Sequence, residues 1–476
     1  MAQKKNKKSI IILSLLIILM GTNLTFAEKI TLNEAIKLGL SQNSEIKAQK
    51  RELKNIEKEL LSIKAKQNWH VDIGGNFSKT IDEKGDNFSK IIDEQNNLIM
   101  ANGVKININK TLPSGLTIQP ELCLKEDDFN PELQVNLSHS LLPSTPTNLQ
   151  KQYWKAEKNL LIAKINLTKL KKERIISWVD TYLNLTRLAE KQELYQKVVK
   201  KAKNNLKKVK EKHKIGEAGK KELLTAEISL ENARYNMIEM GKRIEETKMN
   251  FYKKLGIKDN EIILDRQNEL LFDLTNHVNA MIKGHIVESD INQLMSTIEQ
   301  ENFNLMVNRI NREIFKKEKE WIKNEGRTNA TISGDYDSIN NDFTIGINVS
   351  YQVYDGGEKD INLEKKEFEL EKNLDQHDDI YIQLQIRLNQ YLSDIELSQL
   401  KLNKNKKVLE KSELELKVAK KQLDIGLINY LDYQEVYIRQ QENKLNVKSL
   451  RDSLLIDKLN LVKLMNVDQL QEVFLK

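Results

Sequence analysis

The chain has a single cysteine, and all five of its prolines lie in one short window. With Cys123 alone, no intrachain disulfide can form and a thiolate metal cluster is excluded. No two of the six histidines are spaced three or four residues apart, as a zinc site on a helix requires. A glycine-rich phosphate loop, a nucleophile elbow and paired catalytic carboxylates are also missing. We therefore expect no enzyme activity, no metal and no cofactor.

An excess of one charge is missing as well. The formal net charge is +7, and four of the lysines precede the first apolar run, which leaves 7 − 4 = +3 for the rest of the chain. So small an excess argues against a nucleic-acid-binding protein. Charged residues make up 30% of the chain against 39% apolar residues, a balance typical of long solvated helices.

Long apolar runs are limited to one, from Ile10 to Met20, which is shorter than the ~20 residues of a transmembrane helix. Lysines precede it and the small-residue site Thr25-Phe26-Ala27 follows it. This is the pattern of a secretory signal, which we predict over residues 1–27. No cysteine follows the run, so lipidation is not expected there.

The 330 residues after Pro146 contain no proline (476 − 146 = 330), so they are free to be helical almost throughout. Long helical segments are predicted to begin near Thr147 and Gly357 and to break at Ile215-Gly216 and Ile425-Gly426. Both pairs of positions are 210 apart (357 − 147 and 426 − 216). We interpret this offset as a tandem repeat of residues 28–256 and 257–476.

Strands are predicted near 70–80 and 132–142 in the first repeat and near 329–337 and 343–354 in the second. In each, apolar residues alternate with small polar ones over about the ten residues that a tilted strand needs to cross a bilayer. Aromatic residues near the strand ends suit a lipid interface; they are Trp69, Trp321, Tyr351 and Tyr354. The pattern favours a membrane β-barrel over strands half-buried on a soluble core.

The first repeat has an insert over residues 81–132, with a hairpin predicted near 103–125. This hairpin either adds two strands to the barrel wall or projects outside it as an extracellular flap. Four strands cannot close a barrel, because the sheet edges would be unpaired in lipid. The chain must therefore oligomerise, and three copies would supply twelve strands, or eighteen with the hairpin.

The order of these elements resembles the TolC-type outer-membrane efflux family over nearly the whole sequence. The resemblance is carried by the opening Ile30-Thr31-Leu32-Asn33-Glu34-Ala35-Ile36, by the junction Tyr351-Gln352-Val353-Tyr354-Asp355-Gly356-Gly357, and by the two Ile-Gly turns. It implies an α+β membrane protein: a homotrimer with an outer-membrane β-barrel of four or six strands per chain, continued by a periplasmic α-helical barrel. The implied partners are a periplasmic adaptor, an inner-membrane pump and outer-membrane lipid.

The turns at Gly216 and Gly426 would then form the periplasmic tip. Asp432 and Glu435 are three residues apart, so they share a helix face, and they match the two constricting acids of the family. Glu222 matches Asp432 by the repeat offset. Three-fold symmetry would gather these carboxylates at a pore that favours cations. The alternative is that they are first-turn acids favoured by the helix dipole.

The tip also departs from the family, since Leu423 and Ile428 stand where its best-known members carry a tyrosine and an arginine that latch the closed state. Closure would instead use apolar contacts among Leu427, Ile428, Tyr430 and Leu431. The apolar turn residues, Ile215, Ile425, Leu427 and Ile428, are equally suited to docking the adaptor. The sequence does not separate a gate from a docking surface.

Three functions remain after this reading. The first is a passive exit duct for efflux or secretion that opens at its tip. The second is an outer-membrane-anchored coiled-coil scaffold or adhesin without transport. The third, a peripheral protein with a basic helical face, is disfavoured by the small net charge and by the alternating strands.

Overall fold

The computed structural model describes residues 29–77, 102–125, 131–257, 263–264, 274–280, 282 and 291–466. The predicted signal over 1–27 and the start of the insert lie outside these ranges. The chain divides into two compact units. The first comprises residues up to Lys47, Leu170–Ile298 and Leu384 onward; the second comprises Ala48–Lys169 and Glu299–Gln383. Each unit is described by itself.

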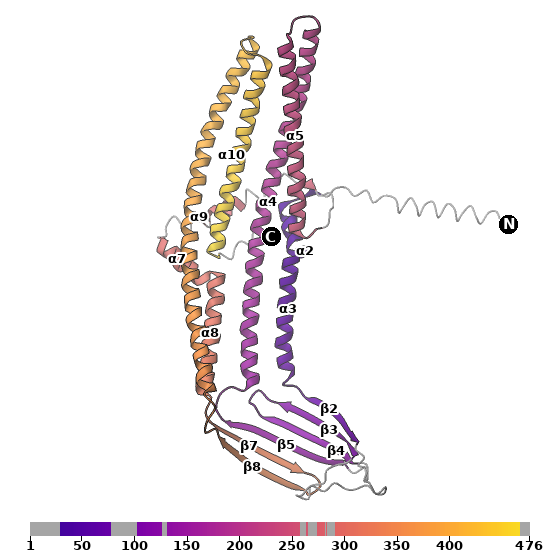
Figure 1. Ribbon diagram of the computed structural model, residues 1–476, viewed down its shortest axis with the longest axis vertical. Helices are drawn as coiled ribbons and strands as arrows, with labels where there is room; N and C mark the ends of the chain where they lie inside the picture. The colour runs from indigo at the N-terminus through magenta and orange to yellow at the C-terminus, as the bar shows by residue number, and fades with distance from the viewer. Residues whose placement is uncertain are drawn as a thin grey trace, which may run out of the picture. The chain divides into compact units, whose positions relative to one another are not determined.

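The second unit contains an antiparallel six-stranded sheet in the order β2-β3-β4-β5-β7-β8 (Figure 1). Its strands are β2 (His70–Phe77), β3 (Asn102–Thr111), β4 (Thr117–Lys125), β5 (Pro131–Leu142), β7 (Thr328–Asp337) and β8 (Asp342–Tyr351). The predicted hairpin is therefore β3 and β4, which pair within the sheet between β2 and β5. Six strands per chain, rather than four, is the observed arrangement of the described residues.

The pairing register gives the sheet one apolar and one polar face. Ile73 pairs with Ile106, Ile106 with Leu122 and Leu122 with Leu133, so apolar side chains continue from strand to strand on one side. Across the last pair, Ile332 opposes Ile347. The other face carries polar residues that alternate with these, among them Asp72, Asn107, Gln119, Asn136, Ser333 and Asn348. A sheet with these two faces suits lipid on one side and water on the other.

Helices of the second unit pack through aromatic and ionic contacts. They are the larger part of α3 (Ser44–Ala65), the first part of α4 (Asn148–Lys214), α8 (Phe303–Asn324) and the first part of α9 (Glu358–Asp424). Trp154 of α4 meets Trp321 of α8 edge to face, with ring centres 5.5 Å apart. The Glu318 carboxylate on α8 contacts the Lys155 ammonium of α4 and lies 2.9 Å from that of Lys366 on α9. One acid thus joins three helices.

The first unit has its core where α2 (Leu32–Gln42) packs against α5 (Lys220–Leu255) and the second part of α4. Thr31 and Glu34 form a capping box that starts α2. Gly39 faces the fully buried Trp178 so closely that a Cβ there would lie 2.6 Å from the indole ring. The side-chain amide of Asn43 donates to the Lys254 carbonyl at 2.6 Å. These contacts explain the residue types of the chain's opening segment.

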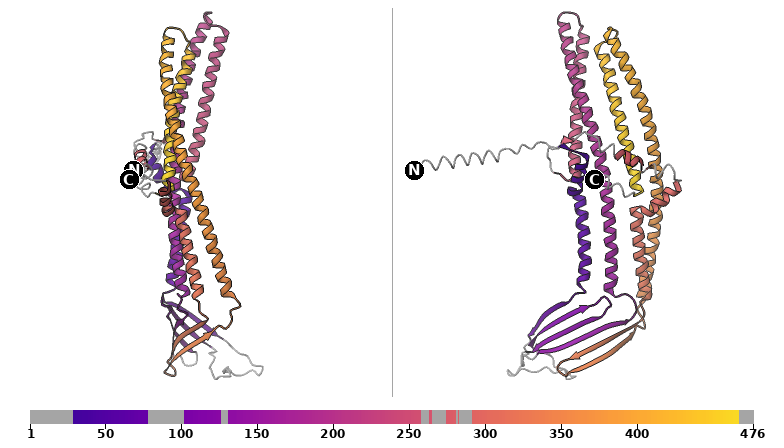
Figure 2. Two further views of the ribbon diagram at one scale, coloured as in Figure 1. Left: turned by 90° about the vertical axis from the view of Figure 1, so that its left-hand side faces the viewer. Right: turned by 180° about the vertical axis from the view of Figure 1, so that it is seen from behind.

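The parallel pair of β1 (Lys29–Ile30) and β6 (Ile263–Leu264) and the helix α7 (Ile291–Glu301) also belong to this unit. Its longest features are two helical hairpins, α4 with α5 and α9 with α10 (Tyr430–Leu464), which Figure 2 shows from two sides. Both α4 and α9 have 67 residues, and their first residues differ by 358 − 148 = 210. An apolar cluster joins α4 to α5, including Leu194, Val198, Leu206 and Leu230.

None of the described helices is both long enough and apolar enough to cross a membrane. Within the same ranges, no group of histidine, cysteine, aspartate and glutamate side chains is arranged to hold a metal ion.

Candidate functional site

The two Ile-Gly turns have the same backbone geometry. Gly216 and Gly426 adopt φ of 80° and 76°, a left-handed conformation that glycine enters without a Cβ clash. The Glu217 amide donates to the Lys212 carbonyl at 2.9 Å, and the Leu427 amide donates to the Gln422 carbonyl at 2.8 Å. Each turn is therefore a Schellman motif that ends one long helix before its partner begins.

The turn residues present a concentrated apolar surface. Ile215, Ile425 and Leu427 are 70, 71 and 70% exposed, whereas Ile428 is half-buried. Tyr430 and Leu431 are also half-buried. Whether these exposed apolar side chains contact another molecule stays a prediction.

The three predicted tip acids lie at the starts of α5 and α10. Asp432 is the third residue of α10 and Glu222 the third of α5, and both are exposed. The Asp432 carboxylate accepts from the Asn429 amide at 3.4 Å, and Asn429 caps the same helix in return. Glu435 is exposed one turn further along. Asp432 therefore has a capping role of its own, and whether the three acids line a pore stays a prediction.

Of the four predicted interface aromatics, three are exposed. Trp69 precedes β2, Tyr351 ends β8 and Tyr354 follows it, and all three are surface residues of the second unit. Trp321 is instead 6% exposed within α8, packed on Trp154. An interface aromatic must present its ring to lipid, and the buried ring of Trp321 does not.

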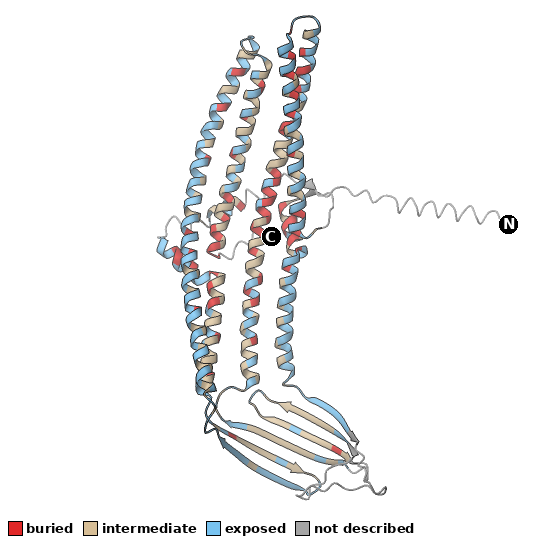
Figure 3. Ribbon diagram, viewed as in Figure 1, coloured by how far each residue is buried: buried red, intermediate tan, exposed pale blue. Residues whose placement is uncertain are grey.

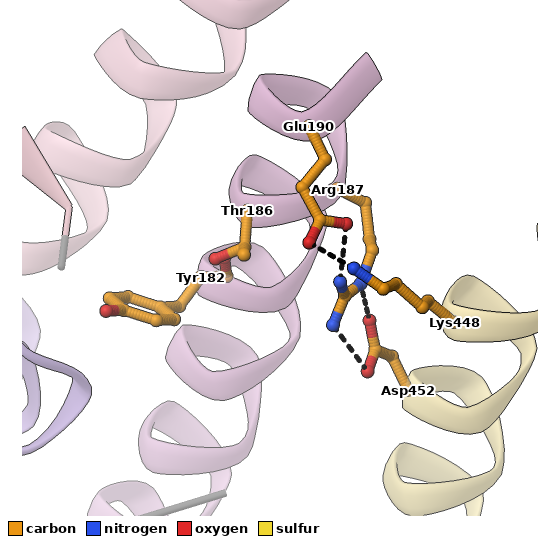
Figure 4. A network of polar contacts seen from close by, with 6 residues as sticks. All are labelled: Tyr182, Thr186, Arg187, Glu190, Lys448 and Asp452. Atoms are coloured by element: carbon orange, nitrogen blue, oxygen red, sulfur yellow. Dashed lines mark hydrogen bonds and ion pairs between the residues drawn. The ribbon is translucent and has the colours of Figure 1, made fainter. Parts of the chain in front are cut away.

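A network of charged residues joins α4 to α10 within the first unit (Figure 4). The Arg187 guanidinium donates to both Asp452 carboxylate oxygens, at 2.5 and 3.3 Å, and to Glu190 at 2.7 Å. The Lys448 ammonium donates to the other Glu190 oxygen at 2.6 Å. The side chains of Arg187 and Asp452 are only 15% and 19% exposed. We call these four residues the α4–α10 clasp.

Burial and pairing act in opposite directions on the clasp carboxylates. Burial raises the pKa of Asp452 above its usual range, and the Arg187 guanidinium only partly offsets this. Burial also tends to raise the pKa of Glu190, but hydrogen bonds from Lys448 and Arg187 outweigh it, so that pKa is lowered. Asp452 therefore depends on Arg187 to stay ionised.

Further contacts continue between the same two helices toward the turns. The Tyr195 hydroxyl donates to the Glu442 carboxylate at 2.9 Å, and burial with this contact raises the pKa of Tyr195 to about 12. The Lys201 ammonium lies 3.4 Å from the centre of the Tyr437 ring. The helices are thus joined by polar contacts at successive turns. Nothing in the sequence singles these residues out, because Lys, Glu and Arg occur throughout both helices.

No protein-family model and no curated protein matches this chain. Solved structures do match, over 91% of the chain in each case. The Campylobacter jejuni CmeC outer membrane channel aligns at 14% identity over 85% of its length, with a TM-score of 0.62. The Vibrio cholerae outer membrane protein VceC aligns at 13% identity over 96% of its length, with a TM-score of 0.60.

The Neisseria gonorrhoeae MtrE outer membrane channel, solved in its open state, aligns at 11% identity over 88% of its length, with a TM-score of 0.63. The similarity covers both units and nearly all of each solved chain. At these identities it establishes shared architecture. The chain therefore has the fold of TolC-type outer-membrane efflux channels, as its sequence predicts.

Proposed function

We propose that three copies of this chain form a passive exit duct in the outer membrane that continues across the periplasm as a barrel of helices. One observation carries the proposal: a six-stranded sheet with one apolar and one polar face, both of whose edges lack a partner strand among the described residues. Similarity to solved outer membrane channels supports it. Such a duct makes and breaks no bonds, so it is not an enzyme.

The sheet edges explain the need for several copies. β2 pairs only with β3 and β8 only with β7 among the described strands, and most residues of both edges are exposed (Figure 3). In lipid each unpaired backbone group costs several kcal/mol. Pairing of β8 with β2 of the next copy removes both edges, and three copies give 3 × 6 = 18 strands. A barrel of this size encloses a water-filled channel lined by the polar face.

The long helices expose apolar side chains that neighbouring copies would cover. On α5 these are Leu224, Ile228, Tyr235, Ile238 and Met249, which follow each other at steps of 4, 7, 3 and 11. On α9 they are Ile361, Phe368, Ile382, Ile386, Leu397, Leu400, Val408, Leu414 and Val418, while Leu374 is also exposed but lies outside this series. Steps of this kind put the residues on one helix face. A stripe of this length on a solvated helix is the pattern of a helix–helix seam.

At the tip, the exposed residues Ile215, Ile425 and Leu427 would dock a periplasmic adaptor that links the duct to an inner-membrane pump. Asp432, Glu435 and Glu222 would form the constriction, with Ile428 closing behind them. Opening is a rearrangement of packed helices. The same reasoning assigns residues 28–256 and 257–476 to two structural repeats, each ending its long helix at one tip turn.

The two faces of β8 offer a matched test of the membrane barrel. Ile345 lies on the apolar face and Thr344, its neighbour, on the polar face. A lysine on the lipid face costs ~2–4 kcal/mol near the bilayer centre, whereas a lumen-facing lysine is tolerated. Ile345→Lys should therefore lower the amount of trimer in outer-membrane fractions and Thr344→Lys should not. Equal amounts of trimer for both variants would contradict the proposal.

A further inference from the structure

The second unit contains a cavity of about 600 Å³ where α3 ends, β3 turns into β4 and α4 begins. Its polar lining consists of two ammonium groups, three amides and a phenol, those of Lys64, Lys110, Gln67, Asn68, Gln150 and Tyr153. Leu112 and Pro113 complete it. The volume is in the range of small-molecule sites. No carboxylate is among these lining residues.

Among the residues that the structure describes, neither lysine of the cavity has an anionic partner. Among the described residues, the Lys64 ammonium contacts the Tyr153 ring, 5.4 Å from its centre, and the Lys110 ammonium contacts the Trp69 ring, 5.0 Å from its centre. Neither forms an ion pair within the described ranges, whereas Lys151, Lys155 and Lys366 of the same unit each pair with a glutamate. Two like charges beside one cavity favour a bound anion.

The amides add directional donors. The Gln150 side-chain oxygen accepts from the Thr147 amide at 2.8 Å, so its NH₂ group remains available to the cavity. Phosphate oxygens accept several such hydrogen bonds at once, and bonds between ionised groups are the strong ones. The lining therefore matches a phosphate group better than it matches a neutral ligand.

The position of Lys110 points to the source of that phosphate. Lys110 pairs with Ile118, so it lies on the apolar face of the sheet, at the end of β3 beside the exposed Trp69. A lysine with a neighbouring tryptophan at the end of an apolar strand face is the arrangement found at a membrane interface. Leu112 and Pro113 give the cavity an apolar side next to its charged one.

We propose that this cavity binds the phosphate of an anionic phospholipid in the leaflet nearest the helices. The proposal rests on the membrane barrel proposed above. Lys64 and Lys110 neutralise the headgroup, the three amides orient it, and Leu112 with Pro113 contacts the start of its acyl chains. A bound lipid would join α3, α4 and the β3–β4 turn at one point.

The test compares the full-length protein with Lys64→Gln plus Lys110→Gln and with a control, Lys58→Gln plus Lys66→Gln. The control removes the same amount of charge, from α3 and the residue just after its end, and changes no residue of the lining. Native mass spectrometry counts lipids retained from micelles that contain phosphatidylglycerol or phosphatidylcholine. We expect wild type and control to retain phosphatidylglycerol selectively and the first variant to bind it roughly tenfold more weakly.

Equal retention of phosphatidylglycerol by all three proteins would overturn the site. Inorganic phosphate, titrated by calorimetry, separates the sources: binding of phosphate that depends on the two lysines, without lipid retention by wild type, would overturn the lipid assignment. Bilayer conductance is measured on the same preparations. If wild type retains the lipid selectively but does not conduct, only the duct is contradicted. If wild type conducts but all three proteins retain the lipid equally, only the lipid site is contradicted.

Discussion

The α4–α10 clasp gives the sharpest prediction about energetics. Arg187→Met removes the guanidinium and leaves the carboxylates of Asp452 and Glu190 close together in a poorly hydrated place. Breaking a fully buried ion pair costs ~3–5 kcal/mol. The side chains of Arg187, Glu190 and Asp452 are still 15–20% exposed, so the cost should be smaller here. We expect the free energy of local opening of the two helices to fall by about 2–3 kcal/mol.

The second half of the cycle is Asp452→Leu, alone and combined with Arg187→Met. With both charges replaced by apolar groups, no uncompensated charge from that pair remains, and most of the loss should be recovered. Native-state hydrogen exchange of the α4 and α10 amides measures the free energy of local opening in each variant. A loss of about 2–3 kcal/mol is an exchange rate roughly 30- to 150-fold faster in the single variant.

The reasoning fails if the double variant exchanges as fast as Arg187→Met. That result would mean that removing Asp452 recovers nothing once Arg187 is gone, so an unpaired Asp452 carboxylate in the contact drawn in Figure 4 is not the source of the loss. It would also fail if Arg187→Met exchanges like wild type, because a charge left unpaired in a half-buried place must carry a cost.

Three further predictions concern single positions. Gly39→Ala should weaken the packing of α2 by about 1–3 kcal/mol, since its Cβ would meet the Trp178 ring, and faster proteolysis of α2 would show it. Burial alone would raise the pKa of Glu318, but its lysine partners lower it. The stability that this carboxylate contributes is therefore present above its unfolded pKa near 4.5 and is lost as the pH falls through its folded pKa. Glu318→Gln should flatten the acid side of the curve of Tm against pH. Gly216→Ala and Gly426→Ala should each cost about 1–2 kcal/mol in thermal stability, because both require positive φ; an unchanged Tm would contradict the turn geometry.

Much of the fold could be predicted from local pattern. Strict alternation along Phe343 to Val353 identified the last strand, and the missing prolines identified the long helices. The breaks at Gly216 and Gly426 could be predicted from the two Ile-Gly pairs, and the structure adds that both glycines adopt positive φ. The place of the insert hairpin could not be predicted, because alternation along Val104 to Ile108 suits a wall strand and a flap equally. The observed pairing of the hairpin with β2 and β5 shows that its two strands belong to the sheet.

Contacts between segments that are distant in the sequence could not be predicted from it. Arg187 and Asp452 are separated by 452 − 187 = 265 positions, and each has many charged neighbours that look alike in the sequence. Trp321 was misplaced for a related reason: its position close before a strand suits an interface aromatic, but its ring packs on Trp154 of another helix. A pattern reports which face of an element is apolar, and it does not report what covers that face.

The central claim is that this chain forms an aqueous pore, and single-channel conductance of the detergent-purified oligomer in a planar bilayer tests it most directly. We predict small cation-selective currents from wild type, and loss of that selectivity in Asp432→Ala plus Glu435→Ala. Currents that are the same in both proteins would leave the duct in place and remove the acids from its constriction. A well-folded oligomer that never conducts would contradict the duct itself and favour a scaffold anchored in the membrane.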